Sequence, residues 1–268
     1  MNLSVVIPVY NGAKTIVNAV KSVVEQKKPA DDFNIEIIVV NDGSVDNTLQ
    51  VLNEYVRTHQ VQNISIYTTA NGGVSHARNY GINKSRYDWI GFLDADDIWC
   101  NNKLEIQYKY LTESCVEPVF IGSARNEEVL SLCGQKITSL YKARLIDLLI
   151  KVFPQTSTAL VRKDMIMNCG LYDTNMTHSE DADLWVRICA RGGNFYYHPE
   201  STVSTGSGKH NFGDSGLSAN LKLMEKGACY MLHKTRKRGD ISFSVYVLLY
   251  IFFKIKYLRR LIIVKFRG

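Results

Sequence analysis

The first hundred residues alternate between short β-branched apolar runs and segments with the periodicity of an amphipathic helix. The apolar runs cover residues 3–9, 35–40, 64–68 and 89–93, and the helical segments cover residues 14–25, 48–58 and 74–85. Strands and helices that alternate in this way form a mainly parallel sheet with helices on both faces. Right-handed crossovers place the carboxyl ends of these strands at one edge of the sheet. The sequence therefore predicts an α/β fold.

Polar or glycine-rich segments follow these strands. They cover residues 8–12, 41–46, 71–75 and 94–97. Open α/β sheets bind ligands outside the carboxyl ends of their strands. Four such segments at one rim indicate a single ligand site more strongly than any one of them does alone.

The acidic cluster Asp94-Ala95-Asp96-Asp97 comes directly after the fourth apolar run. Carboxylates two positions apart, such as Asp94 and Asp96, reach one hard cation that shares its ligands with substrate phosphates. The metal, Mn²⁺ or Mg²⁺, would neutralise the charge that develops on a departing diphosphate. Taken alone, an Asp-x-Asp sequence is more typical of a solvated turn that caps a helix. Its position beside the other loops favours the cation site.

Three other residues of the rim suit a nucleotide. Asp42 can accept a hydrogen bond from a nucleobase or a ribose, although Asp-Gly is also a common turn. Tyr10 offers a ring for stacking, or is a packing residue. The glycines of residues 71–75 let backbone N–H groups approach a phosphate, and Arg78 either pairs with that phosphate or makes a surface ion pair.

An acidic pair, Glu180-Asp181, opens a helix expected over residues 181–191. A helix N-terminus keeps a carboxylate ionised, so one acid of the pair is a candidate general base; helix capping is the alternative. The histidines lack the spacing of a metalloprotease or a deaminase. His210 lies in a segment rich in Ser and Gly, residues 201–216, which predicts a mobile loop and makes it a candidate ligand of a metal or phosphate.

The positive charge lies in the C-terminal segment. Residues 233–268 contain ten Lys or Arg and one acid, a net charge of +9, while the whole chain carries +6. This distribution differs from that of a nucleic-acid binder. As a helix, the apolar run at residues 241–253 would be about 20 Å long, short of the roughly 30 Å core of a bilayer. We therefore predict an amphipathic helix on an anionic membrane surface, the alternative being a helix packed on the catalytic domain or a second subunit.

Several of these segments together resemble the glycosyltransferase family 2 proteins, which have the GT-A fold. The resemblance covers about residues 3–203. Its marks are SVVIPVYNG (4–12), VVNDGSVDNT (39–48), NGGVSHARNYGI (71–82), FLDADD (92–97), TSTALVRKDMIMNCGLYD (156–173) and SEDADLWVRI (179–188). Each motif alone is a loose match, but the motifs in this order are specific to the family. The resemblance implies a Rossmann-like nucleotide-binding domain with a mixed, mainly parallel sheet, to which the chain adds its basic, helical C-terminal tail.

The resemblance also implies roles for single residues. The expected nucleotide-binding residues are Pro8, Val9, Tyr10, Asn11, Asp42, Gly73, Arg78, Asp94 and Ala95. Asp96 would ligate the metal and Asp94 would touch ribose or metal. A later histidine often completes the ligands in this family, and His210 is the candidate here. Asp181 would be the catalytic base of a single displacement that inverts the anomeric centre.

The chain departs from the processive members of the family, because it lacks their Gln-x-x-Arg-Trp segment and their transmembrane helices. We expect transfer of one sugar at a time from a nucleotide-sugar, usually a UDP-sugar, to a saccharide acceptor. The tail suggests a lipid-linked acceptor in the synthesis of a cell-surface polysaccharide. The alternatives are a nucleotidyltransferase and a non-catalytic nucleotide-sugar-binding subunit of a membrane assembly. Nucleotidyl transfer is disfavoured because it needs no acceptor-side base such as the Glu180-Asp181 pair offers.

The expected domains are a GT-A domain over residues 1–232 and a basic amphipathic segment over 233–268. Within the former, residues 1–100 would bind the nucleotide-sugar and residues 101–232 the acceptor. The six cysteines are scattered, with no C-x-x-C pair, which indicates reduced thiols in the cytoplasm. The start of the chain predicts no signal peptide. We expect a cytoplasmic protein at the inner face of the cell membrane, with no nucleic-acid partner, and leave a homo-oligomer open.

Overall fold

A computed structural model describes residues 1–113, 117–206 and 219–267 of the chain. The strands are β1 (Leu3–Val9), β2 (Ile35–Asn41), β3 (Ile64–Thr68), β4 (Trp89–Phe92), β5 (Asp97–Trp99), β6 (Phe120–Arg125), β7 (Ser131–Leu132), β8 (Gln135–Lys136), β9 (Tyr141–Lys142), β10 (Leu160–Arg162) and β11 (Phe195–Thr205). The helices are α1 (Ile16–Val24), α2 (Thr48–Thr58), α3 (Val74–Lys84), α4 (Lys103–Glu113), α5 (Leu145–Ile150), α6 (Lys163–Cys169), α7 (Glu180–Ala190), α8 (Leu221–Lys237) and α9 (Phe243–Arg267), and a 3-10 turn, η1, covers Thr156–Thr158.

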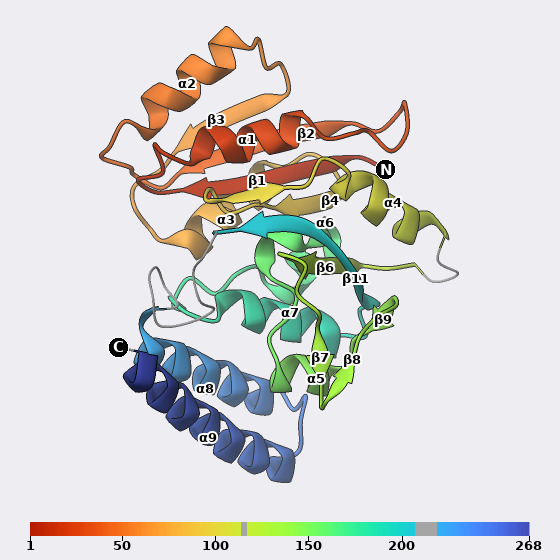
Figure 1. Ribbon diagram of the computed structural model, residues 1–268, viewed down its shortest axis with the longest axis vertical. Coiled ribbons are helices and arrows are strands. Elements are labelled where there is room, and N and C mark those ends of the chain that lie inside the picture. The colour runs from red at the N-terminus through yellow and green to blue at the C-terminus, as the bar shows by residue number, and fades with distance from the viewer. Residues whose placement is uncertain (114–116, 207–218, 268) are drawn as a thin grey trace.

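One mixed sheet forms the centre of the molecule. Its strand order is β3-β2-β1-β4-β10-β6-β11-β5, with β9 beside β11 (Figure 1). Strands β1 to β4 pair in parallel, as their helical connections require. Strand β10 is antiparallel to both of its neighbours, β4 and β6, so the parallel half ends there. The mixed, mainly parallel sheet expected from the sequence is therefore present.

Alternating side chains of the parallel strands face two helical layers. Val5 and Ile7 of β1 belong to the same buried cluster as Val20 of α1. Val6, between them in the sequence, belongs to the opposite cluster, together with Ile82 of α3. Because both faces of β1 are covered, all seven of its residues are buried. This packing holds the carboxyl ends of β1, β2 and β4 firmly at one edge of the sheet.

The predicted elements agree with the structure in the first half of the chain and less well after it. The helix expected at 48–58 and the strand at 3–9 have those bounds. The strand expected at 156–161 is wrong: η1 occupies its first half and only β10 is a strand. The loop expected at 201–216 is wrong over residues 201–205, which extend β11; residues 207–216 lie outside the described part of the chain.

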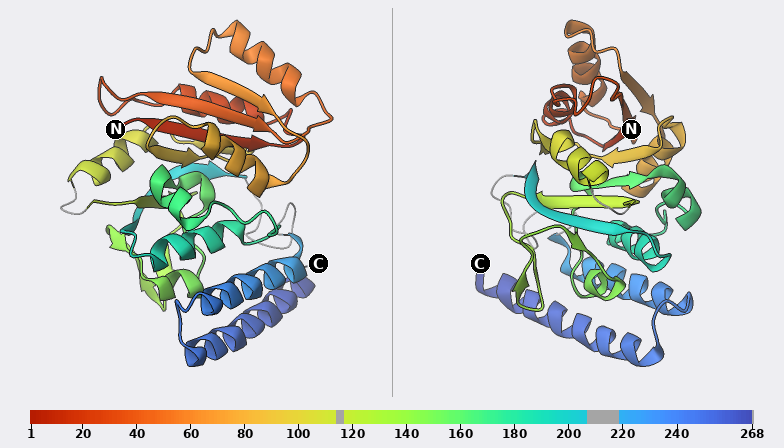
Figure 2. Two further views of the ribbon diagram at one scale, coloured as in Figure 1. Left: turned by 180° about the vertical axis from the view of Figure 1, so that it is seen from behind. Right: turned by 90° about the vertical axis from the view of Figure 1, so that its right-hand side faces the viewer.

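The C-terminal helices form an antiparallel hairpin below the sheet. Figure 2 shows α8 and α9 side by side on the side of the molecule away from β3. Leu232 of α8 and Leu249 and Phe253 of α9 are buried in the same cluster as Trp185 of α7. The division expected between residues 232 and 233 falls inside α8. Within the described residues, none of the helices is both long and apolar enough for a transmembrane segment.

Candidate active site

The loops after β1 and β2 are tied to each other at the rim of the sheet. The backbone N–H of Asn11 donates to Ser44 Oγ at 2.9 Å, and Asn11 Oδ1 accepts from the N–H of Val45 at 2.9 Å. The N–H of Gly12 donates to Thr48 Oγ1 at 2.9 Å. Tyr10 remains 54% exposed beside these bonds. Its ring is therefore available to a ligand, as the stacking role requires.

Asp42 is buried and holds the glycine-rich loop that follows β3. Its two carboxylate oxygens accept from the backbone N–H groups of Gly72, at 2.9 Å, and Gly73, at 2.8 Å. Gly73 has a φ of +87°, a conformation that side chains rarely adopt. Asp42 thus positions this loop, and the N–H groups of Gly72 and Gly73, which were expected near a phosphate, are bonded to Asp42 in this structure. Its expected contact with a nucleobase stays a prediction.

Arg78 lies at the centre of the rim and is 4% exposed. Its Nη2 donates to Asp94 Oδ1 at 2.7 Å and its Nη1 to Glu180 Oε1 at 2.9 Å. The guanidinium also lies over the ring of Tyr172, 5.3 Å from the centroid. Burial alone would lower the pKa of Arg78, but Asp94, Tyr172 and Glu180 outweigh it and raise that pKa. A permanent cation therefore joins the acidic cluster to the start of α7.

The acidic cluster divides into exposed and buried carboxylates. Asp96 is exposed, and the side chain of Asp94 is 28% exposed. Asp97 is buried, where Oδ2 accepts from Ser157 Oγ at 2.6 Å and from Gln155 Nε2 at 2.9 Å. Burial, with Asp94 and Asp96 nearby, raises the pKa of Asp97 to about 7. Asp94 and Asp96 are thus the members of the cluster that face a ligand, and Asp97 supports their turn.

Asp181 stands in the first turn of α7 and is half-buried. Its Oδ2 accepts from Thr156 Oγ1 at 3.2 Å, and its Oδ1 accepts from the N–H of Ala182 at 2.7 Å. The neighbouring Glu180 is buried. Burial raises the pKa of the Glu180 carboxyl and Asp181 adds to this, while Arg78 opposes it. Of the acidic pair, Asp181 is therefore the more accessible, while Glu180 is buried and bound to Arg78.

A cavity of about 890 Å³ opens on Asp181. Its walls come from the end of β6, the segments 128–133 and 149–155, the N-terminus of α7, and the hairpin of α8 and α9. Pockets that hold small ligands have volumes of about 300–1,000 Å³. The cavity is therefore large enough for a saccharide, and most of its lining residues belong to residues 101–232, whose expected binding of the acceptor stays a prediction.

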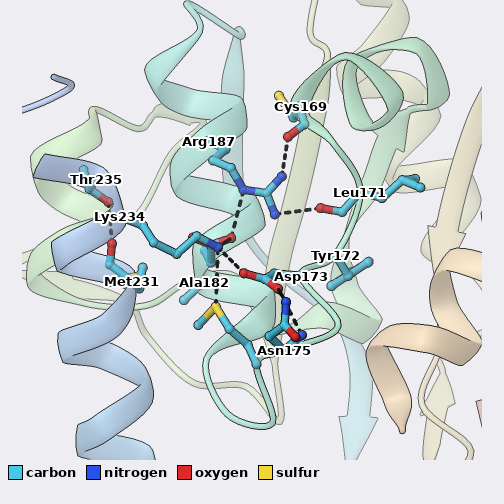
Figure 3. Close-up of polar contacts among 12 residues, drawn as sticks. Cys169, Leu171, Tyr172, Asp173, Asn175, Ala182, Arg187, Met231, Lys234 and Thr235 are labelled. Atoms are coloured by element: carbon cyan, nitrogen blue, oxygen red, sulfur yellow. Dashed lines mark hydrogen bonds and ion pairs between the residues drawn. The ribbon is translucent and has the colours of Figure 1, made fainter. Parts of the chain in front are cut away.

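The far side of α7 is fixed by ion pairs to α8. Asp183 is fully buried, and its Oδ2 accepts from Arg187 Nε at 2.9 Å and Lys234 Nζ at 3.0 Å. Lys234 also pairs with Asp173 Oδ2 at 2.6 Å, and Arg187 donates to the carbonyl of Leu171 at 2.7 Å (Figure 3). Leu171 and Asp173 flank Tyr172, the ring under Arg78. The hairpin therefore helps to position the segment that supports the site.

The donor atoms of the rim suit a divalent cation that arrives with a phosphate ligand. Asp94 and Asp96 offer hard carboxylate oxygens, as Mn²⁺ and Mg²⁺ prefer. One oxygen of Asp94 is already bonded to Arg78. In residues 1–113, 117–206 and 219–267, no group of three His, Cys, Asp or Glu residues converges as a metal site. His210, the expected third ligand, lies outside the residues that the structure describes.

Sequence reasoning missed several residues of the site. Glu180 was expected as one of two candidates for the general base, with no partner predicted for it, yet it binds the buried Arg78. Gln155 and Ser157, which hold Asp97, lie at and within η1, where a strand was expected. Tyr172 lies in the segment 156–173 that carried the family resemblance. That resemblance was the one available signal for η1 and Tyr172, since neither stands in a periodic pattern.

An open sheet with acidic and glycine-rich loops at its carboxyl edge is typical of α/β proteins that bind their ligands there. The chain belongs to glycosyl transferase family 2, whose model matches residues 4–169. It is 35% identical over 191 residues to the minor teichoic acid biosynthesis protein GgaA of Bacillus subtilis, covering 67% of this chain and 41% of GgaA. Other curated relatives, called uncharacterized glycosyltransferases, come from Rickettsia bellii and Rickettsia typhi, and the chain spans 26% and 61% of their lengths.

Solved structures establish the fold. S. aureus TarS 1–349 in complex with UDP-GlcNAc has a TM-score of 0.67 at 17% identity, over 94% of this chain and 71% of TarS. The mannosyltransferase PcManGT of Pyrobaculum calidifontis, in complex with GDP-Man and Mn²⁺, has a TM-score of 0.67 at 18% identity, over 88% of this chain and 64% of that one. The fold is thus of the GT-A type, as the sequence resemblance implied.

Proposed function

We propose that this chain is an inverting, metal-dependent glycosyltransferase that moves one sugar from a nucleotide donor to a saccharide acceptor. One observation carries the proposal. The guanidinium of Arg78 binds Asp94, of the acidic cluster, and Glu180, the residue before Asp181. A group suited to a donor's metal and a group suited to an acceptor hydroxyl are therefore held in one site. That combination fits transfer between two bound substrates.

The donor is proposed to be a UDP-sugar. The exposed ring of Tyr10 suits a base, and the carboxylates of Asp94 and Asp96 suit a cation on a diphosphate. TarS binds UDP-GlcNAc, which supports the choice of nucleotide. The proposed nucleotide contacts are those expected from the motifs: Pro8, Val9, Tyr10, Asn11, Asp42, Gly73, Arg78, Asp94 and Ala95.

The proposed reaction is a single displacement. Asp181 accepts the proton of the acceptor hydroxyl as that oxygen bonds to the anomeric carbon, while the bond from that carbon to the diphosphate oxygen breaks. A divalent cation held by Asp96 and Asp94 supplies charge neutralisation to the leaving diphosphate. Thr156 positions the base through its hydrogen bond to Asp181. PcManGT, whose structure contains Mn²⁺, supports the choice of metal.

The acceptor is proposed to be lipid-linked, with the protein at the inner face of the cell membrane. This proposal depends on α9, whose outward face exposes an apolar stripe at spacings of three and four residues: Leu248, Ile251, Ile255, Leu258, Ile262 and Phe266. Such a stripe beside basic residues suits the interface of an anionic bilayer. The relative GgaA is a teichoic acid biosynthesis protein, which favours a cell-surface polymer as the product. A second copy of the chain is the alternative occupant of the stripe.

A donor screen tests the proposed reaction. The full chain is incubated with UDP-GlcNAc, UDP-glucose, UDP-galactose or GDP-mannose, with Mn²⁺ or with EDTA, and the released nucleotide is measured. We expect release of UDP from one UDP-sugar, dependent on Mn²⁺ and increased by a membrane extract as acceptor. A nucleotidyltransferase would release pyrophosphate from UTP instead. Binding of UDP with no turnover of any donor would favour the non-catalytic subunit and contradict the proposal.

A further inference from the structure

The cavity that opens on Asp181 is also lined by basic residues, which together form its basic wall. That wall is the inward side of α9, which contributes Lys256, Arg259 and Arg260 to the lining. Lys151, from the segment after α5, joins them. Lys256 and Arg260 are part-buried against the body of the protein, whereas the apolar stripe of α9 faces outward. Some of the basic residues of the tail therefore line the cavity and do not face the outside of the protein.

The basic residues in this part of α9 differ in the partners that they bind. Lys254, two residues before Lys256 on α9, forms an ion pair with Glu225. Lys256 donates to the carbonyl of Ile150 at 3.2 Å. Within the part of the chain that the structure describes, Lys256 and Arg259 form no ion pair. Burial lowers the pKa of Lys256 to about 8, and the charges of Arg260 and Lys151 add to this.

Three of the four acids that line the same cavity are paired with other cations, and the fourth, Asp181, lies in the first turn of α7. Glu225 is paired with Lys254, and Glu128 lies 3.7 Å from Arg125. Glu180 is bound to Arg78. Lys256 is part-buried and forms no ion pair within the described residues, so an anion bound beside it would offset part of the cost of burying its charge. A phosphate group accepts charge-assisted hydrogen bonds from Lys and Arg and would stabilise this wall.

We propose that the inward side of α9 is an anion subsite that binds a phosphate group of the acceptor through Lys256 and Arg259. This proposal rests on the proposed function, in which Asp181 meets the acceptor hydroxyl. A ligand with a phosphate at one end and a sugar or polyol hydroxyl at the other fills the cavity from α9 to Asp181. The substrate class is therefore a phosphate-bearing saccharide or polyol. In this proposal α9 binds the acceptor through its basic wall and contacts the membrane through its apolar stripe.

The test distinguishes a phosphate of the acceptor from two other phosphates, the donor's diphosphate and a lipid headgroup. The donor's diphosphate is excluded by saturating the donor site with UDP and Mn²⁺. Binding of glucose 6-phosphate and of glucose to the full chain is then measured by calorimetry. The variants are Lys256→Gln and Arg259→Gln, and the control is Lys265→Gln, which removes an equal charge from an exposed position of α9 outside the cavity. Binding to phosphatidylglycerol vesicles tests a lipid headgroup.

We expect the wild-type chain to bind glucose 6-phosphate more tightly than glucose by about a hundredfold, because the phosphate would accept charge-assisted hydrogen bonds from both Lys256 and Arg259. Lys256→Gln and Arg259→Gln should each lose about tenfold in affinity for glucose 6-phosphate, and Lys265→Gln should lose nothing. Equal affinity in all variants would overturn the proposal. So would a loss confined to vesicle binding, since a lipid headgroup would then be the ligand.

The measurement does not depend on turnover. A chain that binds glucose 6-phosphate through Lys256 but transfers no sugar would contradict the proposed function and leave the anion subsite standing. Arg259 is exposed, so Arg259→Gln keeps the test valid if Lys256→Gln fails to fold. Failure of both variants to alter phosphate binding, with transfer intact, would contradict the subsite alone.

Discussion

Arg78 is the residue on which the site depends, because it compensates two carboxylates in a buried position. The side chain of Glu180 is only 8% exposed, and its ion pair with Arg78 is the contact that offsets the cost of burying it. Asp94, by contrast, keeps a solvent-facing side as well as its bond to Arg78. Losing the bond from Arg78 to Glu180 should therefore destabilise the fold more than losing the bond from Arg78 to Asp94.

Replacing Arg78 by Met should destabilise the fold by about 3 kcal/mol, because it leaves the Glu180 carboxylate buried without a partner. Urea unfolding at pH 8 measures this loss. The double variant Arg78→Met with Glu180→Gln should recover most of it. Arg86→Met is the control, since Arg86 is 65% exposed in its ion pair with Glu36 and should cost under about 1 kcal/mol. A double variant as unstable as Arg78→Met would contradict this explanation.

His198 gives a pH dependence with a defined sign. It is fully buried and stacks on Tyr110 with ring centroids 4.8 Å apart, and neither ring nitrogen has a hydrogen-bond partner in the described residues. Burial, with a smaller effect of Lys103, lowers the pKa of His198 from 6.5 to about 3. The folded state therefore binds fewer protons than the unfolded state between these values. Its stability is lost as the pH falls from about 6.5 towards 3.

The variant His198→Phe keeps the stacking and removes the titration. Relative to wild type, it should gain about 2 kcal/mol in the free energy of unfolding at pH 5 compared with pH 8. Urea unfolding at the two pH values measures the difference. His59→Phe is the matched control, because His59 stacks on Tyr55 at an exposed position and should show no such difference. Equal behaviour of the two variants would refute the pH mechanism.

At the scale of elements, the sequence predicts best where local periodicity and burial agree. Helix α2 and strand β1 have the predicted bounds. An amphipathic stripe is typical of a helix, and an unbroken apolar run of this length is typical of a buried strand. The 3-10 turn η1 was mistaken for a strand, since Thr and Ser in the segment 156–158 are typical of both. Its form is set by distant contacts: Ser157 bonds Asp97, and Thr158 accepts from Lys103. Periodicity carries no information about such partners.

The same limit explains which site residues were found. Asp42, Asp94 and Asp181 each follow a strand or open a helix, so their place in the chain indicates their place at the rim. The role of Glu180 depends on Arg78, 102 positions away, and could not be predicted from local pattern. The C-terminal tail was expected to be one amphipathic unit. Packing on the catalytic domain was only the alternative to a membrane surface, and the structure shows it for the buried face of α8 and α9.

Gly227 tests whether the hairpin positions the start of α7. A Cβ at Gly227 would lie 2.4 Å from the carbonyl oxygen of His178, two residues before Glu180. Replacing a mid-helix Gly by Ala normally stabilises a helix by about 1 kcal/mol. We expect the opposite sign here: Gly227→Ala should destabilise the fold by about 2 kcal/mol and lower transfer activity. Lys226→Ala, at the exposed neighbouring position, is the control. A stabilised Gly227→Ala chain would rule out this close packing.

At the scale of the whole molecule, the catalytic rim and the hairpin form one connected arrangement. The sheet places donor-side groups at one edge, and α7 places Asp181 across from them. The hairpin of α8 and α9 lies on the side of the molecule away from β3 (Figure 2), and the side chains of its apolar stripe are exposed. A protein built this way would meet a lipid-linked acceptor at the surface from which that acceptor extends.

The proposed membrane contact predicts that Leu258→Glu with Ile262→Glu reduces binding to anionic vesicles by tenfold or more, an order-of-magnitude expectation from lost apolar burial. Both side chains are exposed, so folding and UDP binding should be unchanged. Vesicle co-sedimentation measures the effect. Unchanged sedimentation would contradict the contact, and dissociation of a dimer by the same substitutions would favour a second copy of the chain on the stripe.

The central claim is that Asp181 is the base of a transfer between two bound substrates. The most direct measurement compares sugar transfer and UDP affinity in wild type, Asp181→Asn and the surface control Asp164→Asn, whose side chain is 59% exposed. Removing a general base typically costs about 10²–10⁴-fold in rate. The account predicts such a loss for Asp181→Asn, with unchanged UDP affinity and a control equal to wild type. Full transfer activity in Asp181→Asn would contradict it.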